Sequence, residues 1–420
     1  MTRLLAWLAG TLLVLALAAG GLGLAALERQ PRVSRAATIA PQAVAQARHL
    51  LLRNDPRRLQ AGEARQTAIP AELLDEAVNY AATRFLHGRG ALTLAERQAQ
   101  LQLSLSPPWL AGAAYLNITA GLADHDGLPA IDSLRLGALP LPPALAEPLL
   151  GRLLAAAGHE REWQLARQAI RSVRFDGEHQ RLVVAYVWQP ALLERARALA
   201  VPPADLALID AAHRRLAGLL AAHPAGSRVP LASLLAPLLQ TPSNPAYPAR
   251  RAALLVLAAY LAERNLAALL PEAAAWPRLP PVELTLARRY DSAQHFVISA
   301  ALAAWAGEPL AEAIGTYKEL ADARHGSGFS FADLAADRAG TAFGELVAAD
   351  APALTALLAG QPEDADLLPT LDGLPEYLPQ QEFRRRYGGP GQPAYERLLA
   401  EIAQRVAHLP LYRHQGAPRP

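Results

Sequence analysis

Acidic, basic and imidazole side chains gather in one stretch of the sequence. They are Asp291, His295, Lys318, Glu319, Asp322, Asp333 and Asp337. One imidazole nitrogen with several carboxylates suits a divalent cation, and an open position on that cation could activate water. The candidate metal ligands are His295, Glu319, Asp322 and Asp337. The stretch lacks His-Glu-x-x-His, so it predicts no metalloprotease of that class.

Two further interpretations of these residues stay open. In the first they form a buried network, in which Lys318 neutralises an acid and a carboxylate pairs with His295, because unpaired buried charges cost several kcal/mol. In the second, Ser330 caps a helix together with Asp333, and Asp337 faces solvent. The capping interpretation leaves His295 unexplained. Lys318 is the single lysine among 40 lysines and arginines, which favours a position where a compact ammonium fits and a guanidinium does not.

Three helices must position these side chains. The sequence predicts the first over about residues 292–305, the second from about residue 309, and the third from residue 330. Residues three or four apart share a helix face. The three faces therefore combine His295 with Ser299, Glu319 with Gly315 and Asp322, and Asp333 with Asp337, Gly340 and Gly344. A glycine inside a helix costs about 1 kcal/mol relative to alanine, so Gly315 indicates a close neighbour.

This stretch resembles the YfiM-like family of small bacterial lipoproteins in three separate blocks. The matching residues are Asp291, His295, Phe296, Lys318, Glu319, Asp322, Phe329, Ser330, Asp333, Leu334, Asp337 and Gly340. The resemblance covers residues 291–344 and implies a location in the cell envelope, with no established activity. The whole chain also resembles membrane-anchored proteobacterial proteins with the same two-part layout.

Residues 67–190 carry a different pattern. A helix is expected over about residues 70–85, and Leu101 and Leu103 then alternate with polar residues, as in a half-buried strand. Helix, strands, a Gly-x-Leu-Pro-Leu-Pro motif, helix and hairpin follow in an order that resembles the YpmS-like and LmeA-like extracytoplasmic proteins. That resemblance implies a curved sheet with an apolar groove. Its candidate wall residues are Leu101, Leu103, Leu134 and Leu136. An ordinary α+β domain with a filled core is the alternative.

The amino terminus predicts a membrane anchor. Residues 4–27 hold no charge, and as a helix they would span about 36 Å, against a hydrocarbon core of about 30 Å. The apolar part of a cleaved signal peptide is usually only about 7–15 residues. Arg29, Arg32 and Arg35 follow the segment and favour a cytoplasmic body by the positive-inside rule. The layout and the resemblances favour export, so we expect a single-pass inner-membrane protein with its body in the periplasm.

Composition excludes several classes of protein. With 52% hydrophobic and 19% charged residues, the chain is not a charged disordered protein. The absence of cysteine excludes disulfides, zinc–thiolate sites and thiol catalysis. A net charge of +2 gives no strong attraction to nucleic acid, so no nucleic-acid partner is expected.

These observations predict an α+β chain. The expected parts are a transmembrane anchor (1–28), a juxtamembrane stalk with a short helix (29–66), a lipid-binding-like antiparallel-sheet-plus-helix domain (67–190), a helical domain (191–285) and a helical C-terminal domain (286–420). The expected function is to bind an amphiphile or an envelope protein without catalysis or a cofactor. The alternative is a metal-dependent hydrolase that uses the helix face of His295, Glu319 and Asp337.

Overall fold

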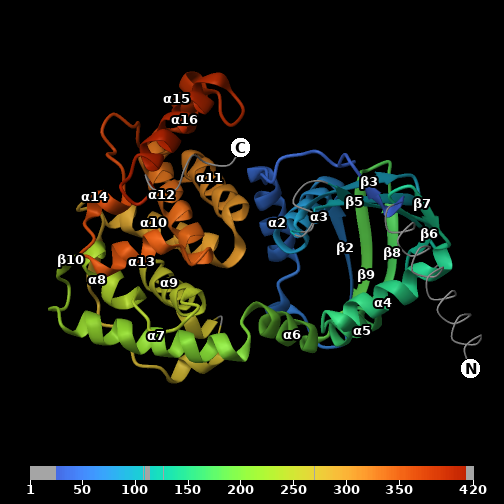
Figure 1. Ribbon diagram of the computed structural model, residues 1–420, viewed down its shortest axis with the longest axis horizontal. Helices are drawn as coiled ribbons and strands as arrows, with labels where there is room; N and C mark the ends of the chain where they lie inside the picture. The colour runs from blue at the N-terminus through green and yellow to red at the C-terminus, as the bar shows by residue number, and fades with distance from the viewer. Residues whose placement is uncertain (1–24, 107, 109–113, 126, 269, 413–420) are drawn as a thin grey trace, which may run out of the picture. The chain divides into compact units, whose positions relative to one another are not determined.

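The computed structural model describes residues 25–412, apart from residues 107, 109–113, 126 and 269. Residues 4–24 of the predicted anchor therefore lie outside the described residues. The chain divides into two compact units, Met1–Arg197 and Ala198–Pro420 (Figure 1). Among the described residues no single helix is long and apolar enough to span a membrane. Two consecutive helices, Phe331–Ala348 and Pro352–Ala359, meet that criterion only as a pair, with a bend of 106° between them.

The described strands of the amino-terminal unit form two antiparallel sheets. The larger has the order β3-β4-β5-β6-β7, and β1 pairs with β5; the smaller has the order β2-β9-β8. The strands are β1 (Leu27–Glu28), β2 (Ala64–Pro70), β3 (Gly88–Ala95), β4 (Gln98–Leu105), β5 (Tyr115–Ala123), β6 (Ala130–Leu136), β7 (Leu139–Leu141), β8 (Ile170–Asp176) and β9 (Arg181–Val187). The helices are α2 (Pro41–Arg53), η1 (Pro56–Arg58), α3 (Ala71–Leu86), η3 (Pro143–Leu145), α4 (Ala146–Ala156), α5 (Glu160–Ala169) and α6 (Pro190–Ala200).

Helices link the strands of the smaller sheet to those of the larger sheet along the chain. The helix α3 follows β2 and precedes β3, while α4 and α5 lie between β7 and β8 in the chain. The edge strand β3 is protected by α3: Asp75 accepts a hydrogen bond from the backbone N–H of Leu92 (2.8 Å), and Asn79 accepts one from Gly90 (3.3 Å). These hydrogen bonds occupy edge N–H groups that could otherwise pair with a strand of another chain.

Part of the predicted stalk is hydrogen-bonded to the larger sheet. Backbone N–H groups of Arg32 and Val33 both donate to Ser104 Oγ at 2.9 Å, and Asn117 Nδ2 donates to the carbonyl of Gln30 at 2.9 Å. Ser104 and Asn117 are paired across β4 and β5 and lie on the polar face of the sheet. Residues 30–33 therefore cover part of that face.

The carboxy-terminal unit is mainly helical, and its two short strands pair in parallel. Its elements are α7 (Pro203–Ala221), β10 (Arg228–Pro230), α8 (Leu231–Leu239), α9 (Tyr247–Leu261), η4 (Leu266–Ala268), η5 (Pro271–Ala275), β11 (Glu283–Thr285), α10 (Tyr290–Ala306), α11 (Glu308–His325), α12 (Phe331–Ala348), α13 (Pro352–Ala359), α14 (Asp364–Leu367), α15 (Gln380–Tyr387) and α16 (Pro393–Ala407). One core of fully buried side chains, including Leu216, Leu254, Phe296 and Val347, runs through both predicted parts, 191–285 and 286–420. The two form one unit.

The three helices predicted around the polar stretch are confirmed as α10, α11 and α12. Ser330 is the N-cap of α12, and its hydroxyl accepts a hydrogen bond from the N–H of Asp333 at 3.0 Å. A side chain at Gly340 or Gly344 would overlap the backbone carbonyls of Phe296 and Ala300. The two glycines therefore let α12 approach α10 at backbone distance, and this brings the polar faces of the two helices together.

Candidate functional site

Six of the seven predicted polar residues meet in the carboxy-terminal unit. His295 comes from α10, Lys318, Glu319 and Asp322 come from α11, and Asp333 and Asp337 come from α12. Asp291, at the start of α10, turns to a different partner. Its carboxylate pairs with Arg289, with 2.9 Å between Oδ2 and Nη2, and Arg289 also pairs with Glu376 at 2.6 Å. The sequence pattern does not indicate this arrangement, because Arg289 and Glu376 lie far apart in the chain.

Asp337 holds the imidazole of His295 in place. Its Oδ1 lies 3.0 Å from His295 Nδ1 and accepts a second hydrogen bond from Ser299 Oγ at 2.8 Å. Its Oδ2 is buried and has no hydrogen-bond partner among the described residues. A Cβ at Gly315 would lie 2.8 Å from this oxygen. The close neighbour expected at Gly315 is therefore the carboxylate of Asp337.

The Lys318 ammonium lies between three other groups of the cluster. Its Nζ is 3.1 Å from Glu319 Oε1, 2.8 Å from Asp322 Oδ2 and 3.2 Å from His295 Nε2. Glu319 is fully buried, and its other oxygen accepts a hydrogen bond from the backbone N–H of Ser330 at 3.1 Å. The Lys318 side chain itself is 48% exposed. The cluster is thus buried on its carboxylate side and reaches solvent at the lysine.

Burial and charge shift the pKa values of the cluster. Burial lowers the pKa of His295, but the carboxylates of Asp337 and Asp333 outweigh it and raise the pKa to about 9. Burial raises the pKa of Glu319 to about 7, against the opposing charges of Lys318 and His295. The charged imidazole directs Nε2–H toward Asp333 Oδ2 at 3.6 Å, whereas the neutral ring accepts at Nε2 from Lys318. The pKa of Asp333 is also raised by burial.

The space at the cluster is small. A cavity of about 50 Å³ is lined by Gln294, His295, Ile298, Ser299, Leu302, Ile314, Gly315, Lys318 and Asp337. One or two water molecules fill such a volume, whereas pockets for organic ligands usually measure about 300–1,000 Å³. His295, Glu319 and Asp337 can each place one ligand atom within 4.8 Å of the others. This geometry has room for an ion and no room for an ordinary substrate.

A second candidate site lies on the larger sheet of the amino-terminal unit. Strand register aligns Leu101 with Ala120 and Leu134 in one row across β4, β5 and β6. The next row aligns Leu103 with Ile118 and Leu136. The four predicted wall residues thus share one face, and all of them are only half-buried. The opposite face carries polar residues such as Gln100, Gln102, Ser104, Thr119 and Ser133.

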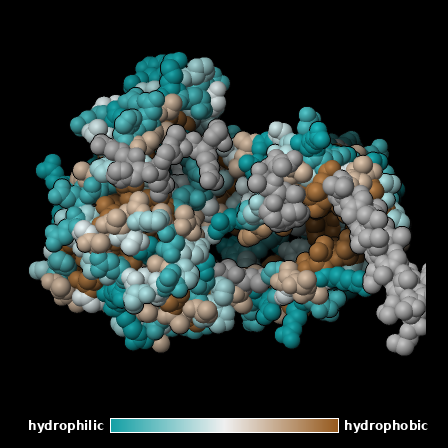
Figure 2. Space-filling model, in the orientation of Figure 1, coloured by the Kyte–Doolittle hydropathy of each residue, from teal (hydrophilic) through white to brown (hydrophobic). Residues whose placement is uncertain are grey.

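The apolar face is closed at one end, and α3 lies against it beside Leu103, because a Cβ at Gly90 would meet Val78 at 2.8 Å. At the closed end, the row of Leu94 and Ala99 packs against Phe175 of the smaller sheet. The facing turns are in close contact there, because Gly177 lies against the backbone of Ala95. At the other end, the row of Leu105, Leu116 and Leu27 lies beside the beginning of the described chain. Figure 2 shows hydrophobic residues beside a hollow in the amino-terminal unit, at the right of the view.

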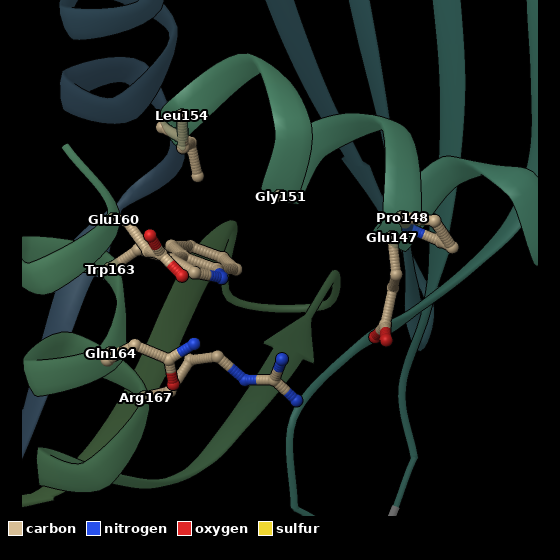
Figure 3. Close-up of a pocket in the computed structure, with 8 residues that line it drawn as sticks. All are labelled: Glu147, Pro148, Gly151, Leu154, Glu160, Trp163, Gln164 and Arg167. Carbon is tan, nitrogen blue, oxygen red and sulfur yellow. The ribbon is translucent and has the colours of Figure 1, made fainter. Parts of the chain in front are cut away.

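Exposed apolar side chains also gather on α4 and around it. They are Leu145, Leu149, Leu150 and Leu153, with Trp163 on α5. An open depression of about 270 Å³ lies between α4 and α5, lined by Glu147, Pro148, Gly151, Leu154, Glu160, Trp163, Gln164 and Arg167. In Figure 3 the side chains of Trp163 and Arg167 point into this gap from α5, and Glu147 points into it from α4. The sequence predicts a helix here without indicating its exposed leucines, because an Ala/Leu-rich segment also suits a buried helix.

Comparison with known proteins finds no matching family model, no matching curated protein and no matching solved structure.

Proposed function

We propose that the amino-terminal unit binds an acyl chain of a membrane lipid along the apolar face of its larger sheet, and that residues 4–27 hold the protein at the inner membrane with its body in the periplasm. The observation that carries the proposal is the row-by-row alignment of half-buried leucines on one face of β4, β5 and β6. The apolar area of these side chains that stays exposed costs about 25 cal/mol per Å². A lipid chain would remove that cost.

The length of the face suits an acyl chain. Four residue steps separate Leu101 from Leu105 on β4, which is about 14 Å at the usual rise of a strand. One leaflet of a bilayer is about 15 Å thick in its hydrocarbon part, half of the usual core thickness. These rows therefore cover most of the length of a chain that fills one leaflet.

The position of β1 favours a membrane lipid over a water-soluble amphiphile. Leu27 is the last residue of the uncharged amino-terminal segment, and it pairs directly with Leu116 on β5. The last row of the apolar face thus lies next to the end of that segment. If the segment spans the bilayer, a lipid would have only a short distance to travel between the membrane and the sheet.

The geometry gives less support to the alternative, a metal-dependent hydrolase. Such an enzyme needs a substrate-sized space beside its metal, and the cavity at His295 and Asp337 measures about 50 Å³. We therefore do not extend the proposal to hydrolysis.

Native mass spectrometry of the full chain, purified from membranes in mild detergent, tests the proposal. We expect the wild type to carry one phospholipid and Leu103→Glu to lose it. Gln102→Glu is the matched control, because residue 102 is adjacent in the same strand and faces the opposite side. Circular dichroism checks that both variants are folded. A wild type without bound lipid, or equal lipid in the two variants, would overturn the proposal.

A further inference from the structure

The Lys318 ammonium occupies a point where nitrogen and oxygen atoms of three side chains converge. They belong to His295 Nε2, Glu319 Oε1 and Asp322 Oδ2, at 3.2, 3.1 and 2.8 Å from Nζ. One imidazole nitrogen and two carboxylate oxygens form a common ligand set for a first-row divalent metal. We propose that this point is a divalent-cation site, built from His295, Glu319 and Asp322, and that Lys318 fills it when no metal is bound. The inference concerns the carboxy-terminal unit and does not depend on lipid binding by the other unit.

Asp337 prepares His295 for this role. A metal-binding histidine usually donates its other ring N–H to a carboxylate, which fixes the tautomer and the orientation of the ring. Asp337 Oδ1 sits 3.0 Å from Nδ1 and is itself held by the Ser299 hydroxyl at 2.8 Å. A metal would displace the Nε2 proton, as metals do when they bind histidine, while Nδ1 keeps its proton on Asp337. Asp337 is therefore a positioning residue.

A separate observation points to a missing positive charge. Asp333 is 7% exposed, and its Oδ2 lies 3.6 Å from the same Nε2 atom. Its Oδ1 is buried without a hydrogen-bond partner among the described residues. A buried carboxylate normally has its oxygens paired, so this one has unused capacity beside the proposed site. A divalent ion would bring two positive charges where the ammonium brings one.

Lys318 can leave the site without unfolding it. Its side chain is half exposed and carries the ammonium on a flexible four-carbon stem. Asp322 beside it is also partly exposed. A bound metal would repel the ammonium into solvent. An arginine would fill this point poorly, since its planar group spreads the charge over three nitrogens. The single lysine of the chain thus stands where a compact, displaceable cation is needed.

Calorimetric titration of the full chain with ZnCl2 at pH 8 tests the inference, with MgCl2 as a contrasting hard cation. We expect one zinc per chain and at least roughly tenfold tighter binding by Lys318→Ala, because the competing cation is gone. Adding His295→Gln to that variant should abolish binding. Cobalt(II) absorption bands should appear in Lys318→Ala and vanish in the double variant, which a merely structural lysine would not cause.

His213→Gln is the matched control. His213 is a buried histidine of α7 whose Nε2 contacts the carbonyl of Pro277 at 2.7 Å, outside the cluster. Its replacement should leave zinc affinity unchanged. Melting curves check that each variant is folded, and Lys318→Met serves if Lys318→Ala is not. The inference is wrong if the lysine-free variant shows no saturable one-to-one binding, if its zinc affinity equals that of the wild type, or if binding survives loss of His295.

Discussion

The two units of the chain bury similar apolar residues to different extents. In the carboxy-terminal unit, Leu235, Leu254 and Phe343 are completely buried. In the amino-terminal unit, Leu101, Leu103 and Leu136 are only partly buried, and most of the buried apolar side chains among its described residues are alanines. Leucine content alone therefore does not decide how tightly a region packs.

The difference follows from how each element finds a partner. Helices α9, α10 and α12 each present apolar residues to one another, so every face is covered from within the unit. A strand directs its side chains alternately to two faces, and the larger sheet needs an equally large partner for its apolar face. The smaller sheet packs against Leu92, Leu94 and Ala99, and α3 lies against the face beside Leu103. We infer that stability resides mainly in the carboxy-terminal unit.

The largest expected effect comes from breaking a backbone contact between α10 and α12 in the carboxy-terminal unit. Gly340→Ala places a Cβ against the carbonyl of Phe296, and backbone has to move to accommodate it. We expect a loss of about 3–5 kcal/mol in the free energy of unfolding, at the upper end for overpacking. Urea denaturation measures it.

Gly218→Ala is the control for that substitution. Gly218 lies within α7, and a Cβ there would meet nothing within 4 Å. Because alanine is favoured over glycine in a helix, this change should stabilise the chain by about 0.5–1 kcal/mol. Similar destabilisation by the two alanines would show that α10 and α12 are not in backbone contact.

A pair of leucine truncations compares the two units directly. Leu235→Ala removes a completely buried side chain and should cost about 3 kcal/mol through lost burial and a cavity. Leu103→Ala removes a partly buried one and should cost less, about 1 kcal/mol, in lipid-free protein. Denaturation of both variants, each followed by a signal from its own unit, provides the measurement. Equal costs would mean that the apolar face of the sheet is packed in solution.

Much of the helical half was predictable from the sequence. The helix starts at Pro309 and Ser330 carry local signals, and the spacing of Gly315, Gly340 and Gly344 by itself indicates close packing. The fold class, mixed α and β with an antiparallel sheet and a helical carboxy-terminal half, is confirmed. Local signals suffice where the element carries its own cap and face.

Other features depend on contacts that the sequence does not encode locally. The strand β2 is short, ends at Pro70 and pairs with β9, which is more than a hundred residues away. The strand β3 begins with Gly88 and Gly90, which are poor strand formers. The same limit applies to the polar cluster. Its residue types were predictable, but the rotation of Asp291 toward Arg289, and of Asp337 toward Gly315, depends on side-chain geometry.

The polar cluster should make the stability of the carboxy-terminal unit depend on pH. Glu319 has a pKa near 4.5 when unfolded and about 7 in the fold, because burial disfavours its charge. Its contribution to stability is therefore complete below pH 4.5 and is lost as the pH rises through 7. Glu319→Gln cannot lose a proton, so the wild type should lose about 2–3 kcal/mol relative to it between pH 4.5 and 7.5. Denaturation at several pH values checks this, and parallel curves for the two proteins would contradict it.

The smallest effect is expected at Lys318, where the polar cluster of the carboxy-terminal unit meets solvent. Its ammonium satisfies Glu319, Asp322 and His295 within 3.2 Å, whereas a guanidinium is wider and planar. The half-exposed stem lets part of the larger group move outward, so Lys318→Arg should cost only about 1 kcal/mol. The control is Arg214→Lys in the exposed pair with Asp210, which should cost less than about 0.5 kcal/mol. Thermal melts at pH 8 separate the two. A cost for Lys318→Arg as small as that of the control would mean that solvent surrounds the ammonium, and not a confined set of side-chain atoms. The tight packing of the carboxy-terminal unit would then not extend to this polar cluster.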